Sequence, residues 1–279
     1  MKIRILIALG IILVGAAYYF LLHGNDLTHS DNKNKSYSIQ NYLNDNPTRI
    51  TSKIHDTNAD LSNLGINSLD GLENIPNASQ IRSLNLSSNQ LVEIKPGTFD
   101  AFTNLQYLTL SYNQLKEIKD KTLNKLGNLK MLDLSYNKIG SLNPGSFEGL
   151  SQLESLSLGF NELKGLALGT FEGLSQLRDL ILRNNKIAHI NPGLLANLSN
   201  LDYLSLKSNQ LTEIPDGAFQ GLARLRRLDL GNNQIFSVQP GVFKDLTILR
   251  WFYLNDNRLR LDDQNRIRTE LPLGIEARF

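Results

Sequence analysis

The chain of 279 residues contains no cysteine, one tryptophan, two methionines and four histidines. Without cysteine it can form no disulfide framework, no thiolate metal site and no cysteine nucleophile. The histidines are scattered, at His23, His29, His55 and His189, with no paired ligand spacing, no HExxH motif and no Gly-x-Ser-x-Gly elbow. The glycines that could cradle a phosphate recur at fixed intervals and are therefore assigned to turns. We expect no metal, no cofactor and no enzymatic activity.

A charge excess of one sign is also missing. Lysine and arginine number 29 against 27 aspartates and glutamates, which gives a formal net charge of +2, and 41% of the residues are hydrophobic. Binding to a polyanion through bulk charge requires a much larger excess, and a disordered chain has fewer hydrophobic residues. We therefore expect a folded chain, and we do not expect nucleic acid as its partner.

Only one long hydrophobic run is present, at residues 5–22, and Lys2 and Arg4 precede it. Its 18 residues reach the lower limit for spanning a membrane and exceed the usual core of a cleaved signal, which favours a retained anchor. The small residues at 14–16 leave a cleaved signal peptide as the alternative. The two basic residues favour a cytoplasmic amino end, so residues 1–23 are expected to place the rest of the chain outside the cytoplasm.

A polar segment, residues 24–52, follows and is interpreted as a spacer. Within it, residues 37–43 could form a short helix whose apolar side consists of Ile39, Tyr42 and Leu43. We expect such a helix to cover the first exposed face of the domain that follows, which we place at residues 53–279.

A repeat with a period of 24 residues dominates that domain, in eight units over residues 81–272 with a degenerate unit at 56–80. Each unit reads LxxLxLxxNxL, and most continue with a Gly-x-Phe-x-x-Leu segment; residues 129–152 show the pattern whole. In this pattern the chain resembles the leucine-rich repeat family. The resemblance covers about four fifths of the chain and implies an α/β solenoid, a curved arc with a concave parallel β-sheet.

The pattern also predicts this architecture by itself. The leucines of each LxL, such as Leu132 and Leu134, alternate with period two, so they point inward from a short strand while Asp133 points outward. Stacked turns would place the strands side by side in a parallel sheet. The return path is wider than the strand, so the stack should curve with the sheet on the inside.

An asparagine follows each strand at the point where the chain turns inward. An Asn amide can donate to carbonyls of its own and the adjacent turn and accept from a backbone N–H, which neither Asp nor Leu can do. We interpret these residues as a structural ladder, with a row of ligand-binding amides as the weaker alternative. They are Asn89, Asn113, Asn137, Asn161, Asn185, Asn209, Asn233 and Asn257.

A row of phenylalanines on the return path should form a second buried spine. It comprises Phe99, Phe147, Phe171, Phe219 and Phe243, with leucine in two units. At the carboxyl end, about residues 261–279, the pattern is lost and a cap is expected. There Asp262 or Asp263 could cap a helix that buries Ile267 and Leu271 and precedes a last edge strand.

The resemblance implies that the concave face binds a partner, and the outward strand positions there carry residues typical of interfaces. We predict the partner-binding residues to be Tyr107, Tyr112, Met131, Tyr136, Phe160, Ile181, Arg183, Tyr203, Arg227, Trp251 and Tyr253. Tyr112, Tyr136 and Phe160 share one position in successive units and should form an aromatic ladder, either to anchor a partner or only to stack on one another. Trp251 could equally pack under the carboxyl cap.

The sequence thus predicts a non-catalytic module that is anchored in the cell membrane through residues 5–22, lies outside the cytoplasm and binds a protein on its concave face, with a glycan as the alternative ligand. A cleaved amino end would instead favour a secreted adhesion protein that binds a host receptor or glycan. A structural envelope protein with an empty concave face is the third interpretation. The sequence does not separate these three.

Overall fold

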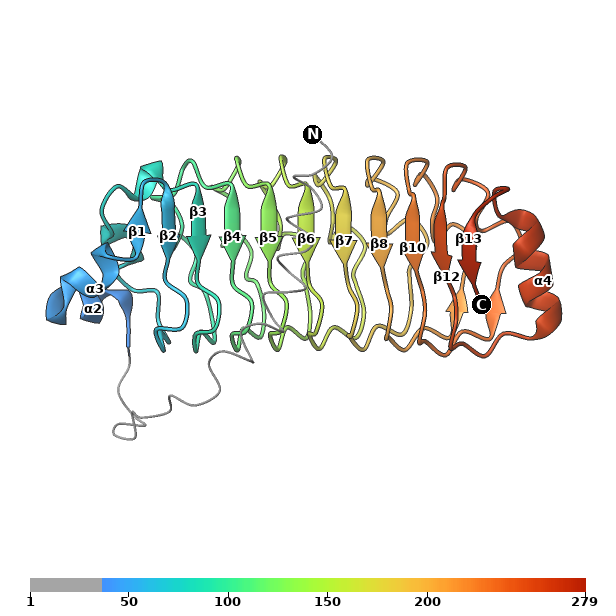
Figure 1. The fold of residues 1–279 in the computed structure, drawn as a ribbon, viewed down its shortest axis with the longest axis horizontal. Helices are drawn as coiled ribbons and strands as arrows, with labels where there is room; N and C mark the ends of the chain where they lie inside the picture. Colours follow the sequence, from blue (N-terminus) through green and yellow to red (C-terminus); the bar gives the residue numbers. More distant parts are fainter. Residues whose placement is uncertain (1–36) are drawn as a thin grey trace. The chain divides into compact units, whose positions relative to one another are not determined.

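The computed structural model of the chain describes residues 37–279 (Figure 1). Contacts define a compact unit from Ser36 to Phe279. The hydrophobic run at residues 5–22 and the first part of the spacer lie outside the described residues. In the part of the chain that is described, no helix has both the length and the apolar character needed to cross a membrane.

The compact unit is a stack of turns, each of which contributes one short strand. In the eight repeat units this strand is three residues long and centred on a buried leucine or phenylalanine. The strands of the eight repeat units are β3 (Ser83–Asn85), β4 (Tyr107–Thr109), β5 (Met131–Asp133), β6 (Ser155–Ser157), β7 (Asp179–Ile181), β8 (Tyr203–Ser205), β10 (Arg227–Asp229) and β12 (Trp251–Tyr253).

These strands form one sheet along the side of the stack, together with β1 (Ile54–His55) and β2 (Asn58–Asp60) at the amino end and β13 (Glu276–Arg278) at the carboxyl end. The strand order is β1-β2-β3-β4-β5-β6-β7-β8-β10-β12-β13 (Figure 1). All neighbouring pairs are parallel except β1 and β2. The register shifts by one whole repeat at each step, so that Leu84 pairs with Leu108 and Leu108 with Leu132. The parallel sheet and the solenoid that the 24-residue period predicts are therefore confirmed.

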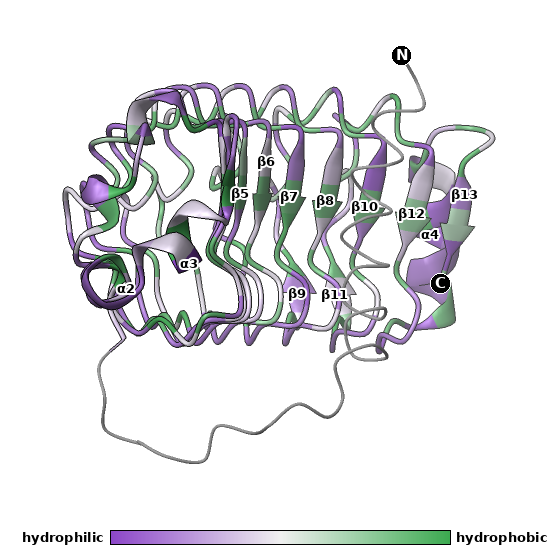
Figure 2. Ribbon diagram, turned by 60° about the vertical axis from the view of Figure 1, so that its left-hand side comes forward, coloured by the Kyte–Doolittle hydropathy of each residue, from purple (hydrophilic) through white to green (hydrophobic). Residues whose placement is uncertain are grey.

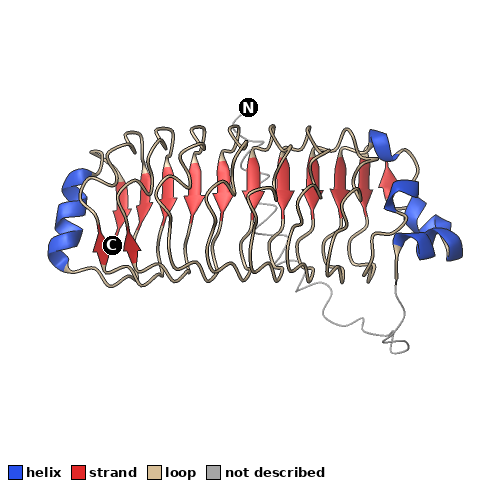
Figure 3. Cartoon of the chain, turned by 180° about the vertical axis from the view of Figure 1, so that it is seen from behind, coloured by secondary structure: helices blue, strands red, loops and turns tan. Residues whose placement is uncertain are grey.

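The return paths contain little regular structure (Figure 3). The first turn has two 3-10 helices, η1 (Leu72–Asn74) and η2 (Ala78–Gln80), and two later turns pair through β9 (Glu213–Ile214) and β11 (Ser237–Val238). Glycine is required at some bends: Gly149 has φ +85°, and a side chain there would collide with the backbone of Asn124.

The core runs unbroken through the stack. The strand leucines are almost fully buried, and so are the phenylalanines of the Gly-x-Phe segments, which leave at most 2% of their surface exposed. Phe147 and Phe171 stack with ring centroids 6.4 Å apart, and Phe219 and Phe243 with centroids 5.9 Å apart. Because each turn buries its apolar side only against its neighbours, the two end turns need separate covers.

The amino end is covered by α2 (Ile39–Asp45), α3 (Pro47–Thr51) and the antiparallel pair β1 (Ile54–His55) and β2 (Asn58–Asp60). Ile39 and Ile50 are completely buried, and the Tyr42 hydroxyl donates a hydrogen bond to the Leu64 carbonyl. Residues 37–52 thus belong to the compact unit, although their polar composition assigns them to a spacer. A few apolar residues on one side of two short helices are enough to cover the end of the stack.

The carboxyl end is covered by α4 (Leu261–Glu270), and β13 (Glu276–Arg278) then adds the last strand (Figure 1). The helix begins after Arg260 without a side-chain cap, so the expected capping role of Asp262 or Asp263 is wrong. Both acids lie in the first turn, where their negative charges interact favourably with the positive end of the helix dipole. Figure 2 shows that α4 is hydrophilic along most of its length, and its buried contact is Ile267.

Candidate functional site

The outer side of the main sheet carries side chains in regular columns, because the register repeats from strand to strand. The residue before each central leucine or phenylalanine and the residue after it both point away from the core. One column therefore runs through Tyr107, Met131, Ser155, Asp179 and Tyr203. We call this outer side the sheet face; all eleven predicted partner-binding residues lie on it or at its border.

The asparagine row lies behind the sheet face and is not accessible to a ligand. Asn137 is representative: its amide nitrogen donates to the carbonyls of Leu110, Leu134 and Ser135, and its oxygen accepts from the N–H of Leu115. Equivalent bonds occur at Asn89, Asn113, Asn161, Asn185, Asn209, Asn233 and Asn257, of which only Asn257 is half-buried and the rest are buried. The row is the hydrogen-bonded ladder that joins successive turns.

Three rings stack at one border of the sheet face. Tyr112 and Tyr136 have centroids 4.2 Å apart with ring planes 9° from parallel, and Tyr136 and Phe160 repeat the same geometry. The Arg183 guanidinium lies 5.2 Å from the Phe160 centroid and extends the stack by one turn. Burial, followed by the hydrogen bond with Tyr136, raises the pKa of Tyr112 to about 12. Tyr112 therefore stays neutral at physiological pH.

The three ring residues have an unfavourable backbone conformation. Tyr112, Tyr136 and Phe160 have φ values of 55°, 54° and 56°, in the left-handed region. The other five turns place small polar residues at this position, namely Ser88, Asn184, Ser208, Asn232 and Asp256. A left-handed residue with a side chain costs roughly 1–2 kcal/mol, and Asn and Asp tolerate it best. A stacked ring pair contributes about 0.5–1.5 kcal/mol, so stacking only partly offsets the cost. The left-handed conformation recurs in every turn, and these three turns are the ones that place a bulky ring on it.

A second cluster lies toward the carboxyl end of the sheet face. Arg227 stands in register between Tyr203 and Trp251, and its guanidinium is 5.4 Å and 5.1 Å from their ring centroids. Arg278 lies 5.5 Å from the ring of Tyr253 and pairs with Glu276 at 3.2 Å. Trp251 is thus half-exposed on the sheet face and is not enclosed beneath the cap.

Two carboxyl groups in this region have perturbed acidity. Burial, followed by the nearby charge of Asp202, raises the pKa of Asp179 to about 6, although Arg178 and Arg227 oppose the shift. Burial also raises the pKa of Asp229, and the N–H of Gly231, which donates to its carboxylate at 3.1 Å, opposes the shift. Asp179, Asp229 and Arg278 were not among the predicted site residues. Their outward strand positions were the only signal in the sequence, since their surroundings depend on neighbouring turns.

The predicted residues therefore form two groups on one face. The amino-terminal group comprises Tyr107, Tyr112, Met131, Tyr136 and Phe160. The carboxyl-terminal group comprises Ile181, Arg183, Tyr203, Arg227, Trp251 and Tyr253, and Arg183 connects the two groups through Phe160. Of the basic residues beside the sheet, Arg178 pairs with Glu154 at 3.8 Å and Arg226 with Asp202 at 3.0 Å, so both are already partnered.

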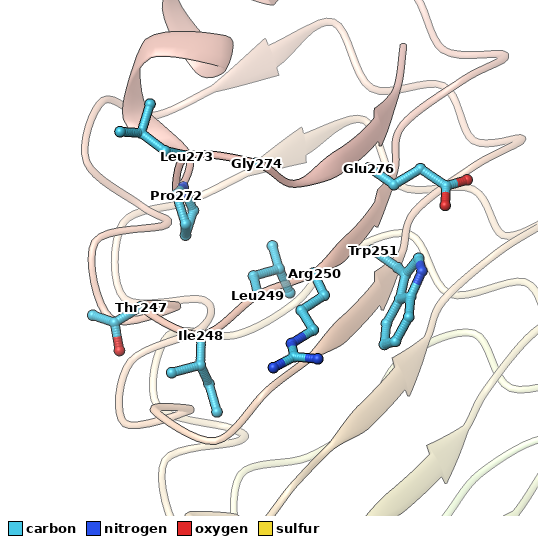
Figure 4. A pocket seen from close by; sticks show the side chains of 9 residues that line it. All are labelled: Thr247, Ile248, Leu249, Arg250, Trp251, Pro272, Leu273, Gly274 and Glu276. Carbon is cyan, nitrogen blue, oxygen red and sulfur yellow. The ribbon is translucent and has the colours of Figure 1, made fainter.

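A hollow of about 560 Å³ lies next to Trp251, between the last repeat turn and the cap (Figure 4). Ile248, Arg250 and Trp251 line it on one side, and Pro272, Leu273 and Gly274 on the other. In residues 37–279 no group of three or more His, Asp or Glu side chains could hold a metal ion.

A family model described as leucine rich repeat matches the chain at residues 60–115, 79–126, 103–163, 151–211 and 199–259. Together the matches span residues 60–259, well over half of the chain. No curated protein matches the sequence.

Two solved structures share the fold. The structure of the TLR13–ssRNA13 complex matches with a TM-score of 0.68 and 32% identity over 74% of this chain. The structure of the Drosophila Toll–Spatzle complex matches with a TM-score of 0.69 and 26% identity over 79% of this chain. The matched parts are 29% and 31% of those chains, so this chain spans less than a third of either protein.

Proposed function

Because the chain belongs to the leucine-rich repeat family, we propose that it is a non-catalytic module that binds a protein partner through its sheet face. The observation that carries this proposal is the set of aromatic rings and arginines on the sheet face, three of the rings on strained backbone. Tyr, Trp, Met and Arg are the residues enriched in protein interfaces. A face that needed only to be soluble would carry small polar residues at these three positions, as the other five turns do.

The rigidity of the sheet supports the same proposal. Each strand is held by its neighbours and by the asparagine ladder, so the side chains on the sheet face are preorganised and lose little entropy on binding. Both structural neighbours are complexes, one with RNA and the other with the protein Spatzle, which supports ligand binding by stacks of this kind. The RNA complex gives no support to the expected exclusion of nucleic acid, so the test below includes it.

We further propose that residues 5–22 hold the module in the cell membrane with the repeats outside the cytoplasm. The proposal is supported by the length of the hydrophobic run and by Lys2 and Arg4 before it. The mass of the amino-terminal peptide of the native protein, with membrane fractionation and a carbonate wash, tests it. An intact end that resists the wash is expected. An end that begins near residue 17 would instead indicate a secreted protein that meets a host receptor or glycan.

The binding proposal is tested with variants of the two clusters. The double variant Tyr112→Asn, Tyr136→Asn places at both positions the residue that Asn184 and Asn232 provide in other turns, so the fold should persist. Its affinity for a captured partner should fall about 30-fold or more if the rings are binding hot spots. Arg227→Ala tests the carboxyl-terminal cluster in the same assay.

Phe236→Asn is the matched control, because Phe236 is 56% exposed but lies away from the sheet face. It should leave the affinity unchanged. If the cluster variants bind normally and Phe236→Asn loses binding, the binding site does not lie on the sheet face. Loss of capture after nuclease treatment would identify the partner as a nucleic acid, and loss after deglycosylation would identify it as a glycan.

A further inference from the structure

The ring stack has two unequal ends. At the Phe160 end the Arg183 guanidinium covers the outer ring face at 5.2 Å. At the Tyr112 end the preceding turn offers only Ser87 and Ser88, whose side chains are too short to cover a phenol ring. Within residues 37–279, the only ring that contacts Tyr112 is Tyr136 and no cation lies over it. The outer face of Tyr112 is thus a free stacking surface.

Exposure agrees with this geometry. Tyr112 has 37% of its surface exposed, whereas Tyr136 and Phe160 are half-buried in the same stack. Since the three residues share one backbone position, the difference reflects the missing neighbour of Tyr112. A planar group placed on Tyr112 would continue the stack toward β3 in the way that Arg183 continues it toward β7.

The charges on this half of the sheet face favour a cation. Strands β3, β4, β5 and β6 carry no lysine or arginine, and their charged side chain is Asp133, close enough to Tyr112 to help raise its pKa. Asp60 on β2 adds a second carboxylate, which accepts a hydrogen bond from Asn85 at 3.1 Å. The basic residues of the sheet face, Arg183, Lys207, Arg227 and Arg278, begin only at the far end of the stack.

We propose that the free face of Tyr112 receives an arginine side chain of the partner protein, which stacks on it as Arg183 stacks on Phe160. This inference rests on the proposed function and specifies the chemistry of the partner at one point of the surface. Guanidinium fits better than ammonium, because it is planar, weakly hydrated and able to stack on a ring. The carboxylates of Asp60 and Asp133 give this half of the sheet face the negative charge that attracts it.

The test uses the full chain with tyrosine rings labelled with carbon-13, titrated with the peptide acetyl-Gly-Gly-Arg-Gly-Gly-amide. The signal of Tyr112 is assigned by its loss in Tyr112→Asn. The same peptide with citrulline in place of arginine is the neutral control of the same shape. The same peptide with lysine carries the same charge but has no planar group. We expect the arginine peptide to shift the Tyr112 signal and to bind about two- to fivefold more tightly than the citrulline peptide. The lysine peptide should fall between them.

In Tyr112→Asn the extra affinity of the arginine peptide should disappear. Asn232→Ser, a substitution at the same position of a distant turn, should retain it, and thermal unfolding of both variants shows that the stack of turns is intact. Equal affinity for the arginine and citrulline peptides, or an arginine preference that survives Tyr112→Asn, would overturn the proposal. The titration needs no natural partner, so a negative titration does not contradict the proposed function. Conversely, a failure to find any natural partner does not contradict a positive titration.

Discussion

The side-chain oxygen of Asn137 accepts a hydrogen bond of 3.0 Å from the backbone N–H of Leu115, which is 22 residues earlier in the chain. Through this bond, and through the bond that Asn137 donates to the Leu110 carbonyl, one turn satisfies backbone groups of the turn before it. Both groups are buried and have no access to water. The asparagines are therefore part of the stacking interface itself.

Replacing Asn137 by leucine should lower the free energy of unfolding by about 1–3 kcal/mol, because buried backbone groups lose their partners. Urea unfolding measures the change. Asn128→Leu is the matched control: Asn128 also donates to the preceding turn, to the Thr103 carbonyl at 2.9 Å, but it is exposed to water. The control should shift the free energy by no more than about 0.5 kcal/mol. Equal effects of the two substitutions would contradict the importance of burial.

Asp179 should make stability depend on pH. Its pKa is raised from the ordinary value of 3.8 to about 6, so the folded chain holds this proton more tightly than the unfolded chain. The contribution of Asp179 to the free energy of unfolding therefore falls as the pH rises from about 4 to about 6, and the loss is complete above that range.

Asp179→Asn removes this dependence. The variant should be more stable than the wild type at pH 7, by on the order of 1–3 kcal/mol, and similar to it at pH 4. Urea unfolding of both proteins at intervals from pH 4 to pH 7 gives the difference. Asp100→Asn, at an exposed carboxylate of a return path, controls for the change of net charge. A difference between wild type and Asp179→Asn that does not vary with pH would contradict the prediction.

Arg227→Ala should expose the Trp251 ring face that the guanidinium now covers at 5.1 Å. Trp251 is the only tryptophan, so its fluorescence emission should move to longer wavelength, and the free energy of unfolding should fall by about 0.5–1 kcal/mol. Arg226→Ala is the control, since Arg226 pairs with Asp202 at 3.0 Å instead of with a ring. Its emission should match that of the wild type. An unshifted spectrum in Arg227→Ala would show that Arg227 does not shield the indole in solution.

Much of the fold follows from the sequence because one local pattern is repeated. Each unit places leucines at alternating positions, so the strands fall on the predicted residues and the columns of the sheet face could be read in order. The two ends of the domain do not follow the repeat, so the pattern predicts fewer of their helices and strands. Helix α3 and the β1–β2 pair were not predicted, because their burial comes from packing against the first turn and not from any periodicity of their own.

The candidate site divides in the same way. The stacking of Tyr112, Tyr136 and Phe160 follows from their shared position and is present. Their left-handed backbone does not follow, because tyrosine and phenylalanine by themselves disfavour it. The contact between Arg183 and Phe160 depends on a long side chain that reaches across one turn, and the acidity of Asp179 depends on charges from three turns. Such relationships appear only when the turns are stacked.

The asparagine ladder also has a direction. In every unit the asparagine accepts a hydrogen bond from a backbone N–H of the preceding turn. The buried polar groups of one turn are therefore satisfied only after the following turn has been made. During synthesis, which proceeds from the amino end, the growing stack is always one turn behind the chain that has left the ribosome. Asn257 closes the last complete turn, and the chain then continues into α4. A product that stops in the middle of the array would leave the polar groups of its last turn unpaired.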